Sequence, residues 1–373
     1  MFTNGGIVAV SGRVAFEIID SREGLLVLKR EWDELWRRSE GSYFQTFSCC
    51  LHSWDVMGGQ RRRLRCLVGR EAGVLVLVWP VVTERRAFWS VARQLGPEAA
   101  EFTDVLVADE PGAAQRVAAA WRTLHDDLGV DLIQLPFVKV GSSLDQAVQG
   151  RGRVLAADPD IAPYAHLRGE SDWESYSRTL SSSHRKKQRN LRRRLAEQGE
   201  VRFEVVKGDD SRCPSLINWM LVHKRQWSER VGKKGAWVFD DRYRDLLVRL
   251  VCDPDGVQQF VVFVLWLDDE PIAVKVAAMG RTHIDLVIAG YDATFGKYSP
   301  GTRLDEFWIP WILNRGLDCD FGAGGEHYKM YWSRNNVRAT LNYSIAGTPW
   351  GVAGSMTQKS VQRARTAVRG WRS

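Results

Sequence analysis

The chain has 373 residues, of which 45% are hydrophobic and 26% are charged. These values are close to those of an average globular protein, and they exclude a mainly disordered, collagen-like or low-complexity chain. Because a single hydrophobic core rarely grows past about 250–300 residues, we expect two domains, residues 1–167 and residues 168–373.

No apolar run reaches the roughly 18 residues that a membrane-spanning helix needs. The first residues lack a basic start followed by an apolar stretch, so we expect no signal peptide and a cytoplasmic protein. The six cysteines include no Cys-x-x-Cys pair, and the seven histidines have no metal-ligand spacing. We therefore expect buried, reduced thiols and no metal cofactor. The oligomeric state stays open.

The formal charge of +7 is unevenly distributed. Residues 184–194 carry seven Lys or Arg and residues 327–373 carry eight, with no Asp or Glu in either segment. Such a segment could bind an anionic partner, for example a phosphorylated cofactor, RNA or a membrane surface. A solvated helix face is the simpler interpretation, in which Leu180, Leu191 and Leu195 are buried and the cations reach into water.

Apolar spacing predicts the helices and strands of the first half. The predicted ranges are, in chain order, strand 14–19, helices 23–38 and 48–57, strands 64–68 and 74–82, helix 111–128, strand 131–135, and strands 152–157 and 164–167. Pro159 and Pro163 are expected to interrupt the pattern between the last two strands.

The second half repeats this order. The predicted ranges are basic helix 173–197, strand 201–206, helices 211–229 and 241–252, strands 257–267, 272–279 and 282–291, helix 301–315, strands 318–321 and 339–346, and a basic C-terminal helix. Consecutive strands are joined by hairpins too short for a parallel crossover, which excludes a doubly wound parallel fold. The predicted fold class is α/β (α+β), with two similar units around mixed, largely antiparallel sheets.

The first candidate for a binding site is residues 296–304, which lead from a strand into a helix. The first turn of a helix has unpaired N–H groups and a partial positive charge, so it binds phosphate well. Gly301 lets a pyrophosphate approach the backbone, and Lys297 and Arg303 add positive charge. The alternative is an ordinary loop in which Pro300 starts a helix.

The second candidate is residues 318–332, where a strand ends in a glycine-rich loop. Asp320 or Glu326 would act as general base, and Tyr328 and Lys329 would orient substrate and stabilise negative charge. In the alternative interpretation Glu326 caps a helix and Lys329 points to solvent. Polar residues beside glycines at a strand end favour the functional interpretation.

A weaker candidate lies on helix 211–229, where His223 and Trp227 would face a cleft and contact substrate. A solvated histidine and a packed tryptophan are the simpler interpretations. No G-x-S-x-G, Walker A or H-E-x-x-H motif is present.

Several short motifs occur in an order that resembles one family, the GNAT-type acetyltransferases of the CelD/BcsL group, which act in cellulose or exopolysaccharide biosynthesis. The motifs are Ser183-His184-Arg185-Lys186, Asn190-Leu191-Arg192-Arg193, Leu221-Val222-His223-Lys224-Arg225-Gln226-Trp227, Asp269-Glu270-Pro271-Ile272-Ala273, Tyr291-Asp292, Ser299-Pro300-Gly301-Thr302, Asp320-Phe321-Gly322, and Glu326-His327-Tyr328-Lys329 followed by Trp332. The resemblance extends over nearly the whole chain.

The resemblance implies two tandem GNAT-like units, with the complete site in the second and a structural role for the first. It implies direct transfer from acetyl-CoA or another acyl-CoA to an amine or hydroxyl, on a sugar or polysaccharide precursor. In such folds a bulged strand parts from its neighbour, and the gap takes the pantetheine arm. By resemblance, Tyr291 lies on the strand that lines this gap, and Pro300, Gly301 and Thr302 form the phosphate turn.

The usual GNAT signature is Gln or Arg, two residues, Gly, any residue, then Gly or Ala. Here Tyr298 stands at the basic position and Arg303 at the small one. The related Fem-type peptidoglycan transferases use aminoacyl-tRNA, and residues 326–329 are also similar to their late aromatic-Lys segment. A Fem-like transferase, for which tRNA would be the nucleic-acid partner, and a non-catalytic protein that binds an anionic polymer are therefore the alternatives.

Overall fold

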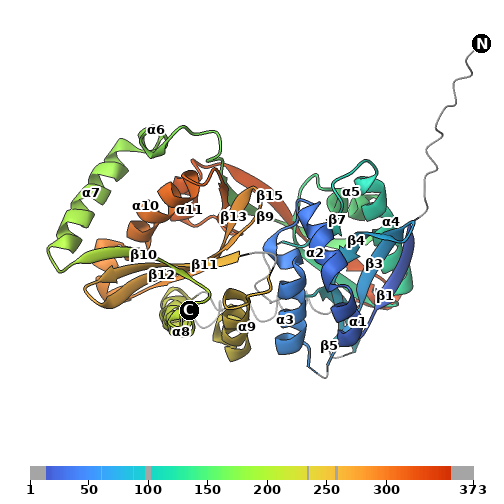
Figure 1. Cartoon of the computed structure of the whole chain (residues 1–373). Helices are drawn as coiled ribbons and strands as arrows, with labels where there is room; N and C mark the ends of the chain where they lie inside the picture. The colour runs from blue at the N-terminus through green and yellow to red at the C-terminus, as the bar shows by residue number, and fades with distance from the viewer. Residues whose placement is uncertain are drawn as a thin grey trace, which may run out of the picture.

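The computed structural model describes residues 14–59, 61–86, 88–96, 102–232, 235–256 and 259–353. Both halves contain helices and strands (Figure 1). The first half contains β1 (Ala15–Ile19), α1 (Arg22–Val27), α2 (Lys29–Arg37), η1 (Tyr43–Gln45), α3 (Phe47–Met57), β2 (Arg62–Leu64), β3 (Cys66–Glu71), β4 (Val74–Trp79), β5 (Val81–Arg86), β6 (Trp89–Gln94), β7 (Leu106–Val107), α4 (Ala113–Asp127), β8 (Leu132–Lys139), α5 (Ser143–Gly150) and β9 (Arg153–Ala165). The second half contains α6 (Trp173–Thr179), α7 (Ser182–Ala196), β10 (Val201–Lys207), α8 (Cys213–Val231), η2 (Ala236–Phe239), α9 (Asp241–Val251), β11 (Gln259–Leu267), β12 (Glu270–Met279), β13 (His283–Tyr291), η3 (Ala293–Tyr298), α10 (Pro300–Leu313), β14 (Asp318–Asp320), α11 (His327–Trp332) and β15 (Val337–Ala346).

The strands form mixed sheets. Among the described residues, eleven strands form one sheet in the order β10-β11-β12-β13-β14-β9-β15-β8-β6-β5-β2, and β1, β3, β4 and β7 form a second sheet. Of the strand pairs in this part of the chain, only β6–β8 and β13–β14 are parallel, and a helix lies between the two strands of each pair. Each half thus has antiparallel strands followed by one parallel pair, which confirms the predicted fold class.

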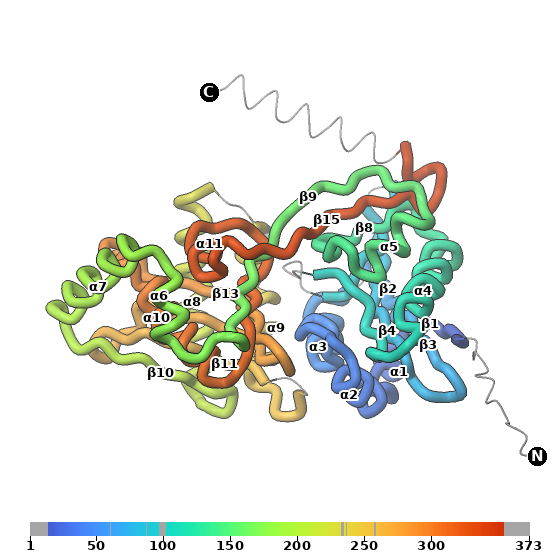
Figure 2. The backbone as a smooth tube through the Cα atoms, turned by 90° about the horizontal axis from the view of Figure 1, so that it is seen from above, coloured from blue at the N-terminus to red at the C-terminus, as the bar shows by residue number. Residues whose placement is uncertain are grey.

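The strands β9 and β15 connect the two halves. They run side by side as a long antiparallel ribbon (Figure 2), and β15 also pairs with β8 of the first half. The last described strand therefore belongs to the sheet that the first half builds, although it follows the second half in sequence.

The predicted interruption of β9 at Pro159 and Pro163 is wrong, because the structure has one strand of 13 residues there. Within the described strands, β9 pairs only with β15 until Tyr164, where β14 joins its other edge. A proline lacks an N–H group, and a strand edge without a partner tolerates that loss.

Helices cover both faces of the sheet in the second half (Figure 1). One core contains α8 and α9 against β11, β12 and β13, and a second core contains α10 on the opposite face. The predicted helix 173–197 is two helices, because the Ser181 side chain accepts a hydrogen bond from the His184 N–H and starts α7. Leu180, Leu191 and Leu195 are buried as predicted.

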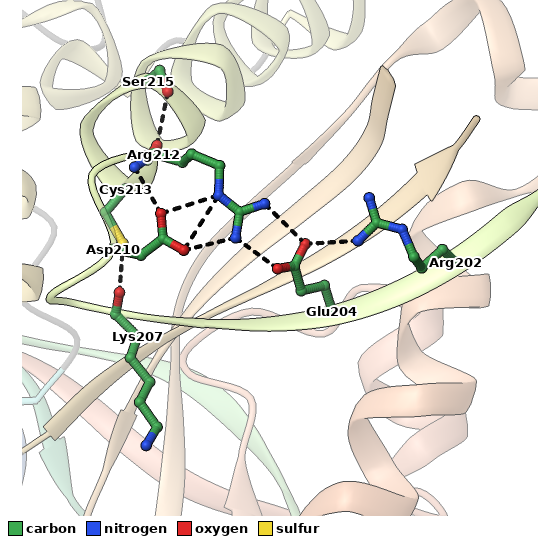
Figure 3. Close-up of polar contacts among 7 residues, drawn as sticks. All are labelled: Arg202, Glu204, Lys207, Asp210, Arg212, Cys213 and Ser215. Carbon is green, nitrogen blue, oxygen red and sulfur yellow. Dashed lines mark hydrogen bonds and ion pairs between the residues drawn. The ribbon is translucent and has the colours of Figure 1, made fainter. Parts of the chain in front are cut away.

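A polar network fixes the turn between β10 and α8 (Figure 3). The Arg212 guanidinium donates hydrogen bonds to Asp210 and to Glu204, and Arg202 also donates to Glu204. The hydrogen bonds from Arg212 lower the pKa of Asp210 to about 2. This network holds the start of α8, which packs against β13.

All six cysteines are free, and five of them are buried. Within the described ranges, no helix combines the length and the apolar character that crossing a membrane requires. Most of the predicted C-terminal helix falls in residues 354–373, which lie outside the described residues.

Candidate active site

A cavity of about 550 Å³ lies in the second half, beside β13. Its walls come from β12, β13, the last turns of α8, η2, the start of α10 and the loop before α11. This volume is typical of small-molecule sites. The two segments that the sequence singled out, around Gly301 and around Glu326, both line it.

The cavity exists because β13 and β14 part. They pair only from His283 to Asp285, and β14 ends at Asp320. Between β12 and β13 the register shifts, so that Val287 is an extra residue on β13. A bulge of this kind bends its strand and turns it away from a neighbour. Residues 286–291 of β13 consequently line the cavity.

The N-terminus of α10 forms one end of the cavity. Ser299 adopts the left-handed conformation (φ 53°, ψ 58°), and Pro300 is the first helical residue. Within the described structure, the Ser299 side chain makes no capping hydrogen bond to the first-turn N–H groups. The N–H groups of Gly301 and Thr302 therefore stay available at the positive end of the helix dipole.

The second candidate segment also contributes to the cavity wall. Glu326, Tyr328 and Lys329 all line it. The Lys329 ammonium donates a hydrogen bond of 2.6 Å to the carbonyl of Ala323, and it lies 3.2 Å from Glu326 Oε2. Glu326 does occupy the cap position of α11, but Lys329 is buried and does not point to solvent.

A second ammonium–carboxylate pair lines the cavity and was missed by the sequence analysis. Lys275 of β12 forms an ion pair with Asp305 of α10, and both side chains are at most 3% exposed. Burial lowers the pKa of Lys275 to about 7, and the charge of Lys329 also lowers it, whereas the carboxylate of Asp305 favours the charged form. The signal in the sequence was a lysine inside the apolar strand segment 272–279.

Trp227 lines the cavity from α8, and the ammonium of Lys224 lies 4.2 Å from its ring centroid. Tyr291 lines it from the end of β13. His223 does not line it; its ring packs 4.1 Å from that of Trp219, and burial lowers its pKa.

Two basic residues of the first candidate segment also lie away from the cavity walls. Arg303 is buried under α7, where it donates hydrogen bonds to Gln188 and to Glu306. Lys297 is exposed and lies 4.9 Å from the ring centroid of Tyr298. The cavity end at α10 is therefore built from backbone N–H groups rather than from these two cations.

Asp320, the other predicted base, faces away from the cavity. Alternate residues of a strand point to opposite faces, and here Phe321 lines the cavity. The Asp320 carboxylate accepts a hydrogen bond of 3.1 Å from Arg338 and another from the Gly322 N–H. Burial and the neighbouring Asp285 raise the pKa of Asp320.

A comparison with models of known protein families finds a match in the second half of the chain. Residues 182–330 match the model of the family described as acetyltransferase (GNAT) domain. A search of curated proteins found no match.

Solved structures share the fold across both halves. FemX superposes with a TM-score of 0.55 at 11% identity, over 86% of this chain and 97% of its own. The C-terminal domain (DUF2156) of a putative lysylphosphatidylglycerol synthetase from Agrobacterium fabrum superposes with a TM-score of 0.52 at 12% identity. The match covers 91% of this chain and 97% of that domain. A conserved protein of unknown function from Bacteroides thetaiotaomicron VPI-5482 superposes with a TM-score of 0.51 at 11% identity. The match covers 90% of this chain and 99% of that protein. At such identities the likeness concerns the fold alone, and the family match is confined to residues 182–330, in the second half of the chain.

Proposed function

We propose that the chain is an acyltransferase that moves an acetyl or other acyl group from a CoA thioester to an amine or hydroxyl. The acceptor is a sugar or polysaccharide precursor, as in the CelD/BcsL group that the motifs resemble. The observation that carries the proposal is a single cavity that connects the open N-terminus of α10 with Glu326 and Lys329.

The residues present fit a CoA thioester as the donor substrate. The N–H groups of Gly301 and Thr302 would bind its pyrophosphate, because a helix N-terminus favours negative charge. The edge of β13 that β14 leaves without a partner from residue 286 onward, within the described strands, offers backbone hydrogen bonds to the pantetheine amides. The Tyr291 ring lies beside this path.

At the other end of the cavity, the acceptor attacks the thioester carbonyl carbon, and the carbon–sulfur bond breaks. Glu326 takes the proton that the acceptor loses, since it is the carboxylate of the two predicted bases that lines the cavity. Lys329 and Tyr328 orient the reacting groups, and the Lys329 ammonium stabilises the negative charge on the carbonyl oxygen.

Calorimetric titration with acetyl-CoA and with longer acyl-CoAs tests the donor class without knowledge of the acceptor. Gly301→Glu would place a carboxylate at the pyrophosphate site, and we expect at least about tenfold weaker binding from the like-charge repulsion. Gly301→Ala is the matched control, because its Cβ would lie at an ordinary 3.8 Å from the Tyr291 ring. Equal affinity for both variants, or no binding to the native chain, contradicts the proposal.

A second candidate is an aminoacyl-tRNA-dependent transferase of the Fem type, and it is favoured by the position of α7. This helix carries exposed cations, and Arg194 lies 5.9 Å from the ring centroid of Tyr298 in η3, next to the cavity wall. A filter assay with charged tRNA separates the two candidates, because saturable transfer from tRNA supports the second. Tight, salt-sensitive binding of an anionic polymer without affinity for any CoA thioester would instead indicate a binding protein.

A further inference from the structure

The buried pair formed by Lys275 and Asp305 has no role in the reaction described so far. Lys275 occupies the middle of β12, between apolar neighbours, and a charged side chain there costs free energy unless it is paired. Both members of the pair nevertheless line the cavity. Apolar residues of similar volume often replace a buried ion pair without loss of stability, so a buried ion pair on a cavity wall is a candidate for a functional role.

The position of Lys275 puts it on the donor side of the cavity. In the β12–β13 register it lies opposite Ala289, on the stretch of β13 along which the proposed thioester arm runs. Its ammonium lies 4.6 Å from the ring centroid of Trp308 and 5.7 Å from that of Tyr328. Glu326 and Lys329 belong to the loop and helix that follow β14, and they line the same cavity.

We infer that Lys275 is a further catalytic residue of the proposed reaction, the general acid that protonates the departing thiolate. The inference rests on the proposed function. Its ammonium gives a proton to the sulfur as the carbon–sulfur bond breaks, while Glu326 holds the proton from the acceptor. The starting state returns when Glu326 releases that proton to solvent and Lys275 takes one up.

The groups around Lys275 suit this task. Asp305 from α10 holds the ammonium in place, Lys329 from α11 repels it, and Cys319 from β14 favours its charged form. An ordinary lysine, with a pKa near 10.4, is a weaker acid than a thiol with a pKa near 8.5. Burial and the charge of Lys329 lower the pKa of Lys275, which makes its ammonium a stronger acid than that of an ordinary lysine.

The test compares two donors, acetyl-CoA and the acetyl thioester of an aromatic thiol, with glucosamine as the probe acceptor. An aromatic thiolate is a good leaving group and needs no proton. We expect Lys275→Met to lower kcat/KM about 100-fold with acetyl-CoA, in the range of general acid catalysis, and far less with the aromatic thioester. A structural role would lower both rates by the same factor, and that result overturns the inference.

Two further variants keep the result interpretable. Lys275→Arg keeps the positive charge but is a far weaker acid, so it too should lose the acetyl-CoA reaction selectively. Lys275→Met combined with Asp305→Leu removes the carboxylate that the single variant leaves buried and unpaired, and it replaces Lys275→Met if that variant does not fold.

Calorimetric titration of the native chain with acetyl-CoA distinguishes failure of the proposed function from failure of the role of Lys275. A native chain that does not bind acetyl-CoA contradicts the proposed function itself. Binding and turnover in the native chain, together with equal losses for both donors in the variants, contradict only the role of Lys275.

Discussion

Individual side chains decide which of the two predicted acids can take part in the reaction. Asp320 and Glu326 are only six residues apart, yet Glu326 lines the cavity and Asp320 is paired with Arg338 on the opposite face. The sequence identified both as candidates because both flank the same glycine-rich loop. It could not choose between them, since the face that β14 turns to the cavity depends on how α10 packs.

Replacement of each acid by its amide should therefore have different effects. Glu326→Gln and Lys329→Ala are each expected to lower turnover at least about tenfold while the fold stays intact, because they remove the base and a charge-stabilising group. Asp320→Asn should instead lower the midpoint of thermal unfolding through loss of its ion pair and leave the pH–rate profile unchanged. Steady-state rates and circular dichroism on the three variants check this, and full activity of Glu326→Gln would contradict the site assignment.

At the scale of the elements, the close contact of β13 with α8 sets the shape of the cavity. Gly290 is the point of contact, because a Cβ there would lie 2.5 Å from the carbonyl oxygen of Met220. Any larger residue must push α8 away from the strand. Trp227, two turns further along α8, would then also shift in the cavity wall.

We expect Gly290→Ala to lower the free energy of unfolding by about 1–3 kcal/mol, as for other overpacked positions, and to weaken binding of acetyl-CoA. Gly296→Ala is the control on the same cavity wall, because a Cβ there meets no atom of the described residues within 4 Å. Urea denaturation followed by calorimetry measures both effects. Equal stability of the two variants would show that α8 adapts to the added methyl group.

Much of this arrangement was predictable from local patterns. Nearly continuous apolar runs predicted β11, β12 and β13, and the Ser-Pro-Gly-Thr sequence predicted the start of α10 at the cavity. The break at Ser181 had a local signal, because its cap involves the His184 N–H only three residues on. The continuous β9 was not predictable, because its partners β14 and β15 are distant in sequence. Lys275 was missed for the same reason, since only packing of α10 brings Asp305 to it.

At the scale of the whole molecule, a buried cluster of charges lies where the halves meet. His283 of β13 lies 3.5 Å from Asp285, and Asp318 of β14 accepts a hydrogen bond from Tyr164 of β9. Burial opposes the charged form of His283, but Asp285 and, more weakly, Asp320 outweigh it and raise the pKa of His283, while Lys139 acts in the opposite direction.

The free energy of unfolding should therefore depend on pH through His283. Because the folded pKa is above the unfolded value of about 6.5, the contribution is fully present below that pH and is lost as the pH rises through the folded pKa. We expect His283→Gln to lack this loss of stability. Urea denaturation of the native chain and of His283→Gln, repeated across this pH range, measures the free energy of unfolding of each. The same pH dependence in both proteins would contradict the assignment.

The ribbon of β9 and β15 has a consequence for biosynthesis. A ribosome makes residues 1–167 well before residues 337–346, yet β8 and β9 both need that late strand as their neighbour. The nascent first half must wait with exposed sheet edges until translation is almost complete. Premature termination anywhere before residue 337 would consequently release a chain in which β8 and β9 lack their shared neighbour, and such exposed sheet edges are prone to aggregate.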